Sequence, residues 1–250
     1  MNYKKTCSLS IVSHGQVELV KKLLSDLEPF SDFILEIFVT LNIPETFEMN
    51  VYSNNIMIIN NSTVKGFGCN HNMALQKANG KYFFVLNPDL RVTTFNFESF
   101  IQKLHAKDVG VLSPSITNLL GHSEDHIRNF PTLKVLFKRF FFKSKTDNFK
   151  YPTNKSELIK SELIDADWIA GMFMVFQKDT FNKINGFDES FFLYLEDVDI
   201  CKRIQSFGYR VCIDPSNKVM HDAQRGSHKS LRLFLIHCYS FIKYFKKWGI

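Results

Sequence analysis

Short apolar runs alternate with amphipathic stretches along the first part of the chain. Gln16–Leu27 repeats its apolar residues at helical spacing, which predicts a helix with one buried face. A second helix is expected from about Asn70 to Ala78, because Asn79-Gly80 is a helix-stop pair. The apolar runs between these stretches are short enough for strands and carry few charges. The predicted strands are Leu9–Ser13, Ile34–Thr40, Asn55–Asn60 and Lys81–Asn87.

This alternation predicts an α/β fold with a doubly wound, mostly parallel sheet flanked by helices. Ligands of such sheets bind beyond the carboxyl ends of the strands, so the loops that follow the strands are the places to search. The second part of the chain is less regular. It holds a strand-like run at Val109–Thr117, a basic stretch, an apolar run at Trp168–Phe176, an acidic cluster and a C-terminal amphipathic stretch.

Charge changes this picture because it is unevenly distributed. The net charge is +6, yet residues 126–150 and 221–250 carry seven and six Lys or Arg, with Asp147 and Asp222 as their only acids. Both patches are also aromatic, which predicts an anionic partner: phospholipid headgroups, a pyrophosphate-linked lipid or nucleic acid. The five scattered cysteines form no C-x-x-C pair, so we expect a reducing compartment. The sequence shows neither a signal peptide nor an apolar run of spanning length.

Asn87-Pro88-Asp89 lies where the fourth predicted strand ends. Pro88 cannot continue a central ladder, so Asp89 is expected to project from the carboxyl edge of the sheet. A carboxylate there could hold Mg²⁺ or Mn²⁺ against a diphosphate. The alternative is an ordinary Asx-Pro turn.

Three further groups could carry chemistry. The loop from Lys65 to Asn72 contains Gly66 and Gly68 and leads into a helix, which suits close approach to an anion as well as simple turn formation. Glu196-Asp197-Val198-Asp199 follows a very apolar segment. Burial there would raise a carboxyl pKa toward that of a base, although acids in a first helical turn need no functional reason. His221 is followed by Arg225 and Ser227 and is either a metal or phosphate ligand or a structural residue.

The order of these groups is informative. The chain carries, in sequence, SHG, GFG-x-N-x-N, LNPD, W-x-x-G-M, NGFDESFFLYLEDVDIC-x-R and a late histidine. This series resembles the family-two bacterial glycosyltransferases of the GT-A fold, most of all the O-antigen and capsule rhamnosyltransferases. The resemblance covers Leu9 to about Trp248, and its most specific part is GFDE…FLYLEDVD. It implies a GT-A domain over 1–220, with a donor half of about 1–117 and an acceptor half of about 118–220. A basic amphipathic segment, 221–250, would pack on that domain.

The resemblance implies a role for each matching residue. Asp89 would hold the metal that bridges the donor diphosphate, with His221 completing the metal or phosphate site. Asp197 would be the catalytic base, with Glu196 beside it. Arg128 belongs to a recurring R-x-F-P element, to which the resemblance assigns no role. The acceptor side would comprise Trp168, Gly171 and Met172, and the donor pocket Ser13, His14, Asn42, Gly66, Phe67, Gly68, Asn70, Asn72 and Asn87.

Two positions depart from the family pattern. Asn87 replaces the first aspartate of a D-x-D motif, which leaves Asp89 as the one carboxylate there. Leu41 stands where many relatives have aspartate and cannot accept a hydrogen bond from the nucleobase ring N–H. Asn42 or a backbone carbonyl is the expected substitute.

The expected reaction is an inverting, single displacement at the anomeric carbon. Mg²⁺ or Mn²⁺ is the expected cofactor. The best match for the donor is dTDP-L-rhamnose, and UDP-hexoses are the alternative. A nucleic-acid-binding module leaves residues 87–89 and the acidic cluster unexplained, so no nucleic-acid partner is expected. A catalytically inactive scaffold is the other alternative, and the intact Asp89 and Asp197 argue against it.

The basic-aromatic patches predict a location at a membrane surface. Leu231–Trp248 mixes Lys and Arg with apolar residues, as in helices that lie in the headgroup plane; a closing core helix with a solvated basic face is the alternative. Leu133–Lys145 has the same character and suits a second contact or a clamp for an acceptor pyrophosphate. We therefore expect a nucleotide-sugar donor, a lipid-linked glycan acceptor and a cytoplasmic protein peripheral on the inner face of the plasma membrane.

Overall fold

The computed structural model describes residues 3–48, 55–106, 108–124, 126–132, 163–222 and 231–249. The strands are β1 (Cys7–Ser13), β2 (Ile34–Leu41), β3 (Ile56–Asn60), β4 (Tyr82–Leu86), β5 (Leu90–Arg91), β6 (Val109–Asn118), β7 (Ile127–Arg128), β8 (Ile164–Asp165), β9 (Trp168–Ile169), β10 (Phe173–Gln177) and β11 (Arg210–His221). The helices are α1 (Val17–Leu27), α2 (Phe67–Lys77), α3 (Phe97–Leu104), α5 (Lys178–Lys183), α6 (Glu196–Ser206) and α7 (Leu231–Trp248), with a 3-10 turn at Glu28–Phe30.

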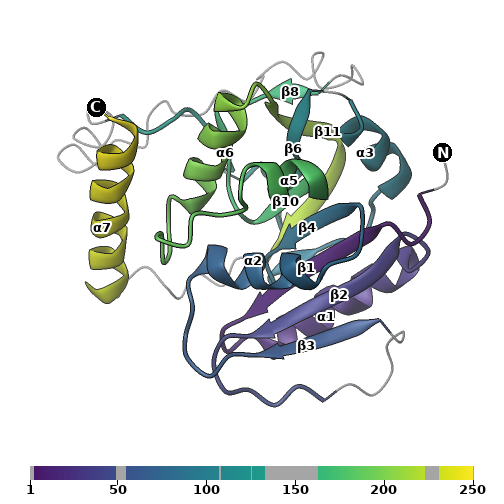
Figure 1. The fold of residues 1–250 in the computed structure, drawn as a ribbon. Coiled ribbons are helices and arrows are strands. Elements are labelled where there is room, and N and C mark those ends of the chain that lie inside the picture. The colour runs from purple at the N-terminus through teal and green to yellow at the C-terminus, as the bar shows by residue number, and fades with distance from the viewer. Residues whose placement is uncertain are drawn as a thin grey trace.

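The main sheet has the strand order β3-β2-β1-β4-β10-β6-β11-β5, with β8 paired to β11 (Figure 1). Neighbours among β3, β2, β1 and β4 are parallel, as the alternation of strand and helix predicts. β10 is antiparallel to both β4 and β6, and β6 is parallel to β11. The predicted fold class, a mostly parallel sheet flanked by helices, is confirmed.

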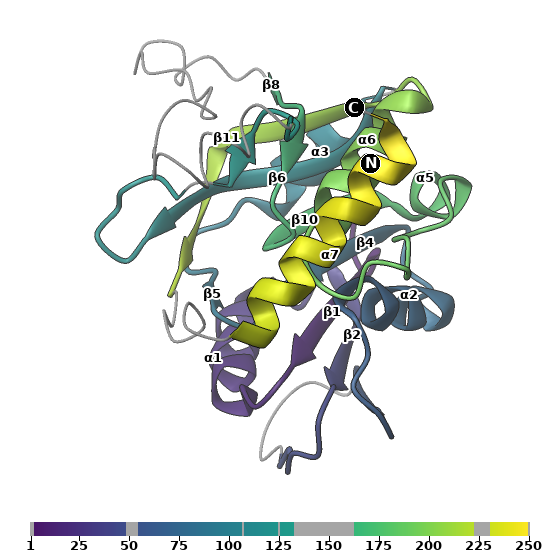
Figure 2. The ribbon, with the colours of Figure 1, turned by 90° about the vertical axis from the view of Figure 1, so that its left-hand side faces the viewer.

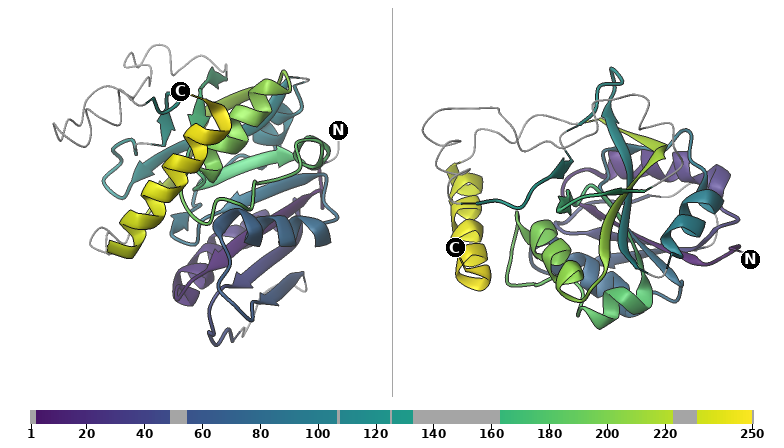
Figure 3. Two further views of the ribbon diagram at one scale, coloured as in Figure 1. Left: turned by 60° about the vertical axis from the view of Figure 1, so that its left-hand side comes forward. Right: turned by 90° about the horizontal axis from the view of Figure 1, so that it is seen from above.

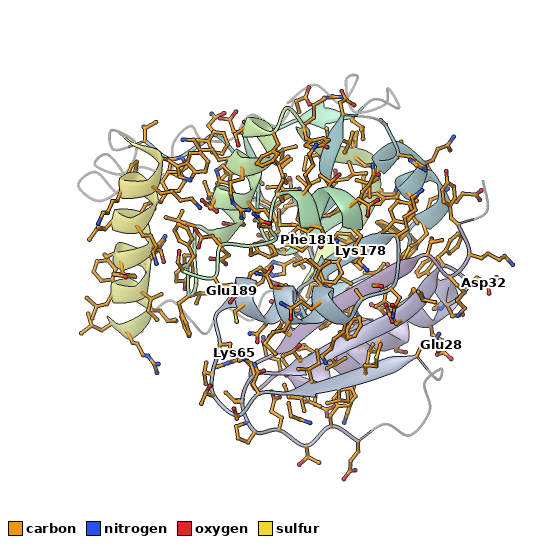
Figure 4. The ribbon with its side chains drawn as sticks, viewed as in Figure 1. Glu28, Asp32, Lys65, Lys178, Phe181 and Glu189 are labelled. Atoms are coloured by element: carbon orange, nitrogen blue, oxygen red, sulfur yellow. The ribbon has the colours of Figure 1, made fainter. Side chains whose placement is uncertain are left out.

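The two faces of the sheet are covered by different helices. Along β4, Phe84 belongs to the core under α1 and α3, whereas Phe83 belongs to the core under α2, α5 and α6. This alternation is the two-residue period of a strand buried on both faces. Phe181 of α5 stacks on Phe176 and Phe83, with ring centroids 4.3 and 5.6 Å apart, and Figure 4 shows it between α5 and the sheet.

Several elements, including α3 and α5, have no counterpart in the sequence-based expectation, and three further differences have a clear cause. The second helix begins at Phe67 rather than Asn70, because Gly66 takes the extended N-cap conformation. The earlier start was not predicted because Gly68, a poor helix former, lies within the first turn. The run Trp168–Phe176 is two strands, separated where Gly171 turns toward α6. β11 has no counterpart among the predicted strands, because its irregular register around Pro215 interrupts the strand pattern.

α7 lies along the outside of the molecule beside α6, as the views in Figures 2 and 3 agree. Its inner face packs on the core that contains α6: Tyr244 is 1% exposed and Ser240 equally buried. Phe241, Phe245 and Trp248 add partly buried contacts to the same core. Within the described residues, no helix is long and apolar enough to cross a membrane.

Candidate active site

One edge of the sheet gathers the predicted site residues. Ser13 at the end of β1 pairs with Leu41 at the end of β2, and Ile11 pairs with Leu86 at the end of β4. β10 runs the other way, so its first residue pairs with Leu86 and the segment before it lies at this same edge. Asn87 accordingly donates its backbone N–H to the carbonyl of Met172, at 2.9 Å. Loops from both halves of the chain therefore meet here.

Asp89 and His221 form a pair at this edge. β5 follows Asp89 and pairs antiparallel with the end of β11, where His221 opposes Leu90. Nε2 of His221 lies 3.1 Å from Oδ2 of Asp89, and both side chains are about one-seventh exposed (14% and 15%). Burial alone would lower the pKa of His221, but the hydrogen bond with Asp89 and the charges of Asp89, Glu124 and Asp222 outweigh burial and raise it. The structure thus joins two residues that are 132 positions apart.

The oxygen and nitrogen atoms of this pair suit a divalent cation. Oδ1 of Asp89 and Nδ1 of His221 are buried and have no hydrogen-bond partner among the described residues. Within the described part of the chain, no third His, Cys, Asp or Glu joins them in a group that could hold a metal ion. A Mg²⁺ or Mn²⁺ ion held by so few protein ligands takes the rest of its coordination shell from water and substrate phosphates. The residues present therefore fit the expected metal.

Asp197 lies in the first turn of α6, after a turn in which Tyr194 and Leu195 adopt left-handed backbone angles (φ 70° and 69°). Its Oδ2 accepts the backbone N–H of Gly171 at 3.1 Å, and its Oδ1 accepts that of Val198 at 2.8 Å. Burial raises the pKa of Asp197, although these hydrogen bonds and the charge of Arg128 oppose the shift. A carboxylate with a raised pKa is a better proton acceptor near neutral pH.

Glu196 is the more deeply buried neighbour, at 5% exposure. Burial and the adjacent charge of Asp197 raise the pKa of Glu196 well above its usual range. Its Oε2 has no hydrogen-bond partner in the described part of the chain. Since adjacent carboxyl groups resist ionising together, the pair favours a charged Asp197 beside a protonated Glu196.

The segment Gly171-Met172 connects the two acidic groups. Gly171 binds Asp197, and the next residue, Met172, binds Asn87 two residues before Asp89. A Cβ at Gly171 would lie 3.1 Å from the ring of Phe67 and 3.7 Å from Cβ of Asp197. This close approach favours glycine at position 171, and the two backbone bonds connect Asp197 with the loop that carries Asp89.

The loop after β2 contains a residue that the sequence analysis missed. Glu45 accepts the hydroxyl of Ser13 at 2.8 Å and the backbone N–H of Val17 at 3.3 Å, so its carboxylate occupies the N-terminus of α1. Its position in the loop after strand two was the available signal. An open hollow of about 480 Å³ adjoins it, lined by Leu41, Ile43, Pro44, Glu45, Thr46, Asn60 and Asn61. A ligand phosphate at the N-terminus of α1 would meet this carboxylate.

Asn42 is a structural junction in the same loop. Its Oδ1 accepts from Nδ2 of Asn61 at 2.8 Å and from the backbone of Lys65 at 2.9 Å, and its Nδ2 donates to the carbonyl of Lys65 at 3.0 Å. Nδ1 of the exposed His14 lies 3.3 Å from the same Nδ2. Asn70 accepts from Asn61 at 2.7 Å. Asn42 and Asn70 hold the loop that leads into α2.

The glycine loop interlocks with the segment before α6. A Cβ at Gly66 would lie 2.6 Å from the carbonyl oxygen of Phe192, and one at Gly68 would lie 2.6 Å from Cβ of Phe187. The backbone N–H of Phe67 donates to Phe192 at 2.9 Å. The two glycines thus allow α2 to pack directly on the later motif.

Asn72 completes this interlock. Its Oδ1 accepts the N–H of Phe187 at 2.9 Å, and its Nδ2 donates to the carbonyl of Phe187 at 2.9 Å and to Glu189 at 3.0 Å. Figure 4 labels Glu189 and Lys65 near the N-terminal end of α2. The side chain of Asn72 is therefore engaged by the protein, and its place is in the wall of the site.

Trp168 and Arg128 lie on the paired strands β9 and β7. The Arg128 guanidinium sits over the Trp168 ring, 5.4 Å from its centroid, and the indole N–H of Trp168 donates to the carbonyl of Asn129 at 2.9 Å. Arg128 is thereby held within electrostatic range of Asp197. Leu133–Lys145, Arg225 and Ser227 lie outside the described residues.

Comparisons with known proteins find similar sequences and similar folds. A family model described as the N-terminal domain of galactosyltransferase matches residues 162–226. Rhamnosyltransferase WbbL of Escherichia coli (strain K12) is 28% identical over 250 residues, which cover 94% of this chain and 90% of that protein. N-acetylglucosaminyl-diphospho-decaprenol L-rhamnosyltransferase of Mycobacterium tuberculosis (strain ATCC 25618 / H37Rv) is 30% identical over 79 residues, 27% of this chain and 26% of that protein.

Solved structures share the fold. GalNAc-T7 with UDP, GalNAc and Mn²⁺ superposes with a TM-score of 0.71 at 14% identity, over 97% of this chain and 48% of that one. The chain thus spans about half the length of GalNAc-T7. The mannosyltransferase PcManGT from Pyrobaculum calidifontis, in complex with GDP-Man and Mn²⁺, gives 0.60 at 13% identity over 97% and 63% of the two chains. The chain is a glycosyltransferase with the GT-A fold that resembles the family-two rhamnosyltransferases.

Proposed function

We propose that the chain transfers L-rhamnose from dTDP-L-rhamnose, with inversion, to a lipid-linked or polysaccharide acceptor in surface glycan synthesis. The observation that carries the reaction type is the carboxylate of Asp197, whose pKa is raised by burial and which one short segment connects to the Asp89–His221 pair. The donor sugar rests on the similarity to the rhamnosyltransferase of Escherichia coli.

In this mechanism Asp197 takes the proton of the acceptor hydroxyl as its oxygen attacks the anomeric carbon. The bond from that carbon to the nucleoside diphosphate breaks as the new glycosidic bond forms, on the opposite face, so configuration inverts. Burial and the charge of Asp197 raise the pKa of Glu196 well above its usual range, which disfavours a second negative charge beside Asp197. Asp89 and His221 would hold the divalent cation, which when bound stabilises the negative charge of the departing diphosphate.

The proposed acceptor carries its sugar on a lipid diphosphate. Support comes from the mycobacterial relative, whose name specifies N-acetylglucosaminyl-diphospho-decaprenol. Trp168, Gly171 and Met172 form the proposed acceptor side, next to Asp197. In this proposal residues 1–220 form the catalytic domain, with donor and acceptor halves dividing near residue 117, and 221–250 pack on it.

We further propose that the protein is cytoplasmic and binds the inner face of the plasma membrane through α7. The helix has a second apolar face that points outward: Leu231, Leu235, Tyr239 and Ile242 are 73%, 59%, 62% and 68% exposed. Arg232 and Lys246 lie on the same helix, which contains no acidic residue. Exposed apolar side chains with basic neighbours suit an anionic lipid surface.

This surface predicts a specific binding defect. The wild type should co-sediment with vesicles that contain anionic phospholipid and should be released at high salt. The double variant Leu235→Glu/Ile242→Glu should lose at least about tenfold in partition, because two charges would enter the interface. Leu120→Glu is the control for an exposed leucine outside α7, since Leu120 is 81% exposed and lies on the connection between β6 and β7. Equal loss in both variants, or no wild-type binding at low salt, would contradict the proposal.

The donor assignment is tested by a thermal-shift screen of nucleotide sugars with and without Mn²⁺ or Mg²⁺. A ligand that binds only the native state raises the melting temperature. We expect the largest rise with dTDP-L-rhamnose plus metal and a smaller rise with UDP-glucose, UDP-galactose or UDP-N-acetylglucosamine. A larger rise with a UDP-hexose would replace the donor while leaving the reaction type in place.

A further inference from the structure

The inner face of α7 holds the turn that carries the catalytic base. The hydroxyl of Ser240 donates to the carbonyl of Leu193 at 2.8 Å, and the ring of His237 packs on Tyr194 with centroids 4.5 Å apart. The ammonium of Lys243 donates to the carbonyl of Ser190. Each contact joins α7 to the segment that ends at Leu195, one residue before α6.

Asp199 is the deepest anchor of α7. It lies in the first turn of α6, two residues after Asp197, and its side chain is fully buried. Its Oδ2 accepts Nε of Arg203 at 2.8 Å, within α6. Its Oδ1 accepts the indole N–H of Trp248 at 2.9 Å and lies 2.8 Å from Nζ of Lys247, both from α7. The end of α7 is therefore bonded to the same helical turn as Asp197.

Lys247 also reaches the other end of the segment. Its Nζ lies 2.6 Å from Oδ2 of Asp188, whose pKa is about 2: burial opposes this lowering, and the hydrogen bonds from Lys247 and Ser190 outweigh it. One ammonium thus connects Asp188, before the turn, with Asp199, after it. The clamped segment is 188–199, and Asp197 lies inside it.

The turn within this segment needs external support. Tyr194 and Leu195 are consecutive non-glycine residues with positive φ, a conformation that L-residues adopt only when their surroundings impose it. On one side the turn is held by α2, through the bond from Phe67 to Phe192. On the other side, among the described residues, it is held by α7.

We propose that Lys247 and Trp248 are positioning residues that set the orientation of the Asp197 carboxylate from the C-terminal helix. The inference rests on the proposed role of Asp197 as base. It assigns to α7 a function in the chemical step that is separate from its outward face, because Trp248 and Lys247 act through the buried Asp199. Lys247 and Trp248 bond to Asp188 and Asp199, and neither residue is among those proposed for the donor pocket.

The test compares Lys247→Ala and Trp248→Phe with Lys21→Ala. Phenylalanine keeps an aromatic ring at this position and removes the indole N–H together with part of the fused ring system. Lys21 is the matched control, because it is also a helical lysine in an ion pair (Nζ to Glu18, 2.8 Å) and is 32% exposed against 33% for Lys247. We expect kcat to fall about ten- to a hundredfold in both α7 variants, as for a displaced catalytic group, with the donor KM within about twofold. Lys247→Arg should restore most of kcat.

Hydrogen exchange gives a readout that does not depend on transfer. Amides of residues 188–199 should exchange faster in Lys247→Ala and Trp248→Phe, while those of β1, β2 and β4 keep their wild-type rates. The proposal would be overturned if kcat of both α7 variants stayed within twofold of wild type, or if the donor KM rose by the same factor as kcat fell. Faster exchange throughout the sheet would also overturn it, because it would show a general loss of stability. Absence of transfer by the wild type with every donor would instead refute the proposed function, and the exchange rates of 188–199 would still decide whether α7 holds this segment.

Discussion

Asp197→Asn is expected to lower kcat by about a thousandfold, because a positioned general base typically contributes 10²–10⁴ in rate. The amide preserves the shape of the side chain but cannot accept the proton of the acceptor hydroxyl. Donor affinity should be nearly unchanged, since the hydrogen bonds of the Asp197 carboxylate to described residues come from Gly171 and Val198, neither of which is proposed for the donor pocket. Single-turnover transfer with radiolabelled donor, together with calorimetric titration of the nucleotide, separates these two effects.

The control is Asp179→Asn, which changes an exposed acid in the first turn of another helix, α5. This variant should turn over at the wild-type rate. Asp197→Asn with more than about a tenth of wild-type kcat would rule out Asp197 as the base.

The same carboxyl group determines the acid limb of the pH profile. Burial raises the pKa of Asp197 in the folded protein, and the base works only when it is unprotonated. Activity should therefore fall, as pH is lowered, at a higher pH than an ordinary aspartate with a pKa of about 3.9 would give. A kcat that stays level down to about pH 4.5 would show an unperturbed group.

Asp89→Ala is expected to abolish the dependence on divalent cation and to lower kcat/KM by about 10²–10³, as expected when several kcal/mol of charge stabilisation is lost. His221 alone cannot replace the hard oxygen ligand that Mg²⁺ and Mn²⁺ prefer. Nucleotide affinity measured with and without Mn²⁺ is the direct test: the metal should tighten binding to the wild type and leave binding to the variant unchanged.

Asp32→Ala serves as the control for Asp89→Ala. Asp32 forms an exposed ion pair with Lys4 at 3.1 Å and lies on the side of the molecule opposite Lys65 and Glu189 (Figure 4), so its loss should leave the metal effect intact. If Asp89→Ala still responds to Mn²⁺ as the wild type does, the metal is held elsewhere.

The parallel half of the fold was predictable because local pattern determines it. Each of β1 to β4 is a compact apolar run, and α1 repeats its apolar residues every three or four positions. β11 was missed for a physical reason. Pro215 and the polar residues beside it interrupt the apolar pattern, and the strand persists because β6 pairs with it on both sides of that irregularity.

The candidate site was predictable residue by residue but not as contacts. Ordered motifs identified Asp89, Asp197 and His221, yet nothing local shows that His221 meets Asp89, since only the pairing of β5 with β11 brings them together. Asn72 illustrates the same limit. Its spacing within the motif suggested a donor contact, whereas in the structure its amide is bonded to Phe187 and Glu189, 115 and 117 positions away.

The buried carboxylate of Asp199 also constrains how this chain can evolve. Replacing Asp199 by an apolar residue would remove the carboxylate that accepts from Nε of Arg203 and from the Trp248 indole. A single substitution at Asp199 is therefore expected to lower stability. Substitutions at Asp199, Lys247 and Trp248 should therefore accumulate in correlated steps. Recombination between diverged homologues that separates the acidic motif from the last helix should yield poorly active hybrids, so the two segments are expected to be inherited together.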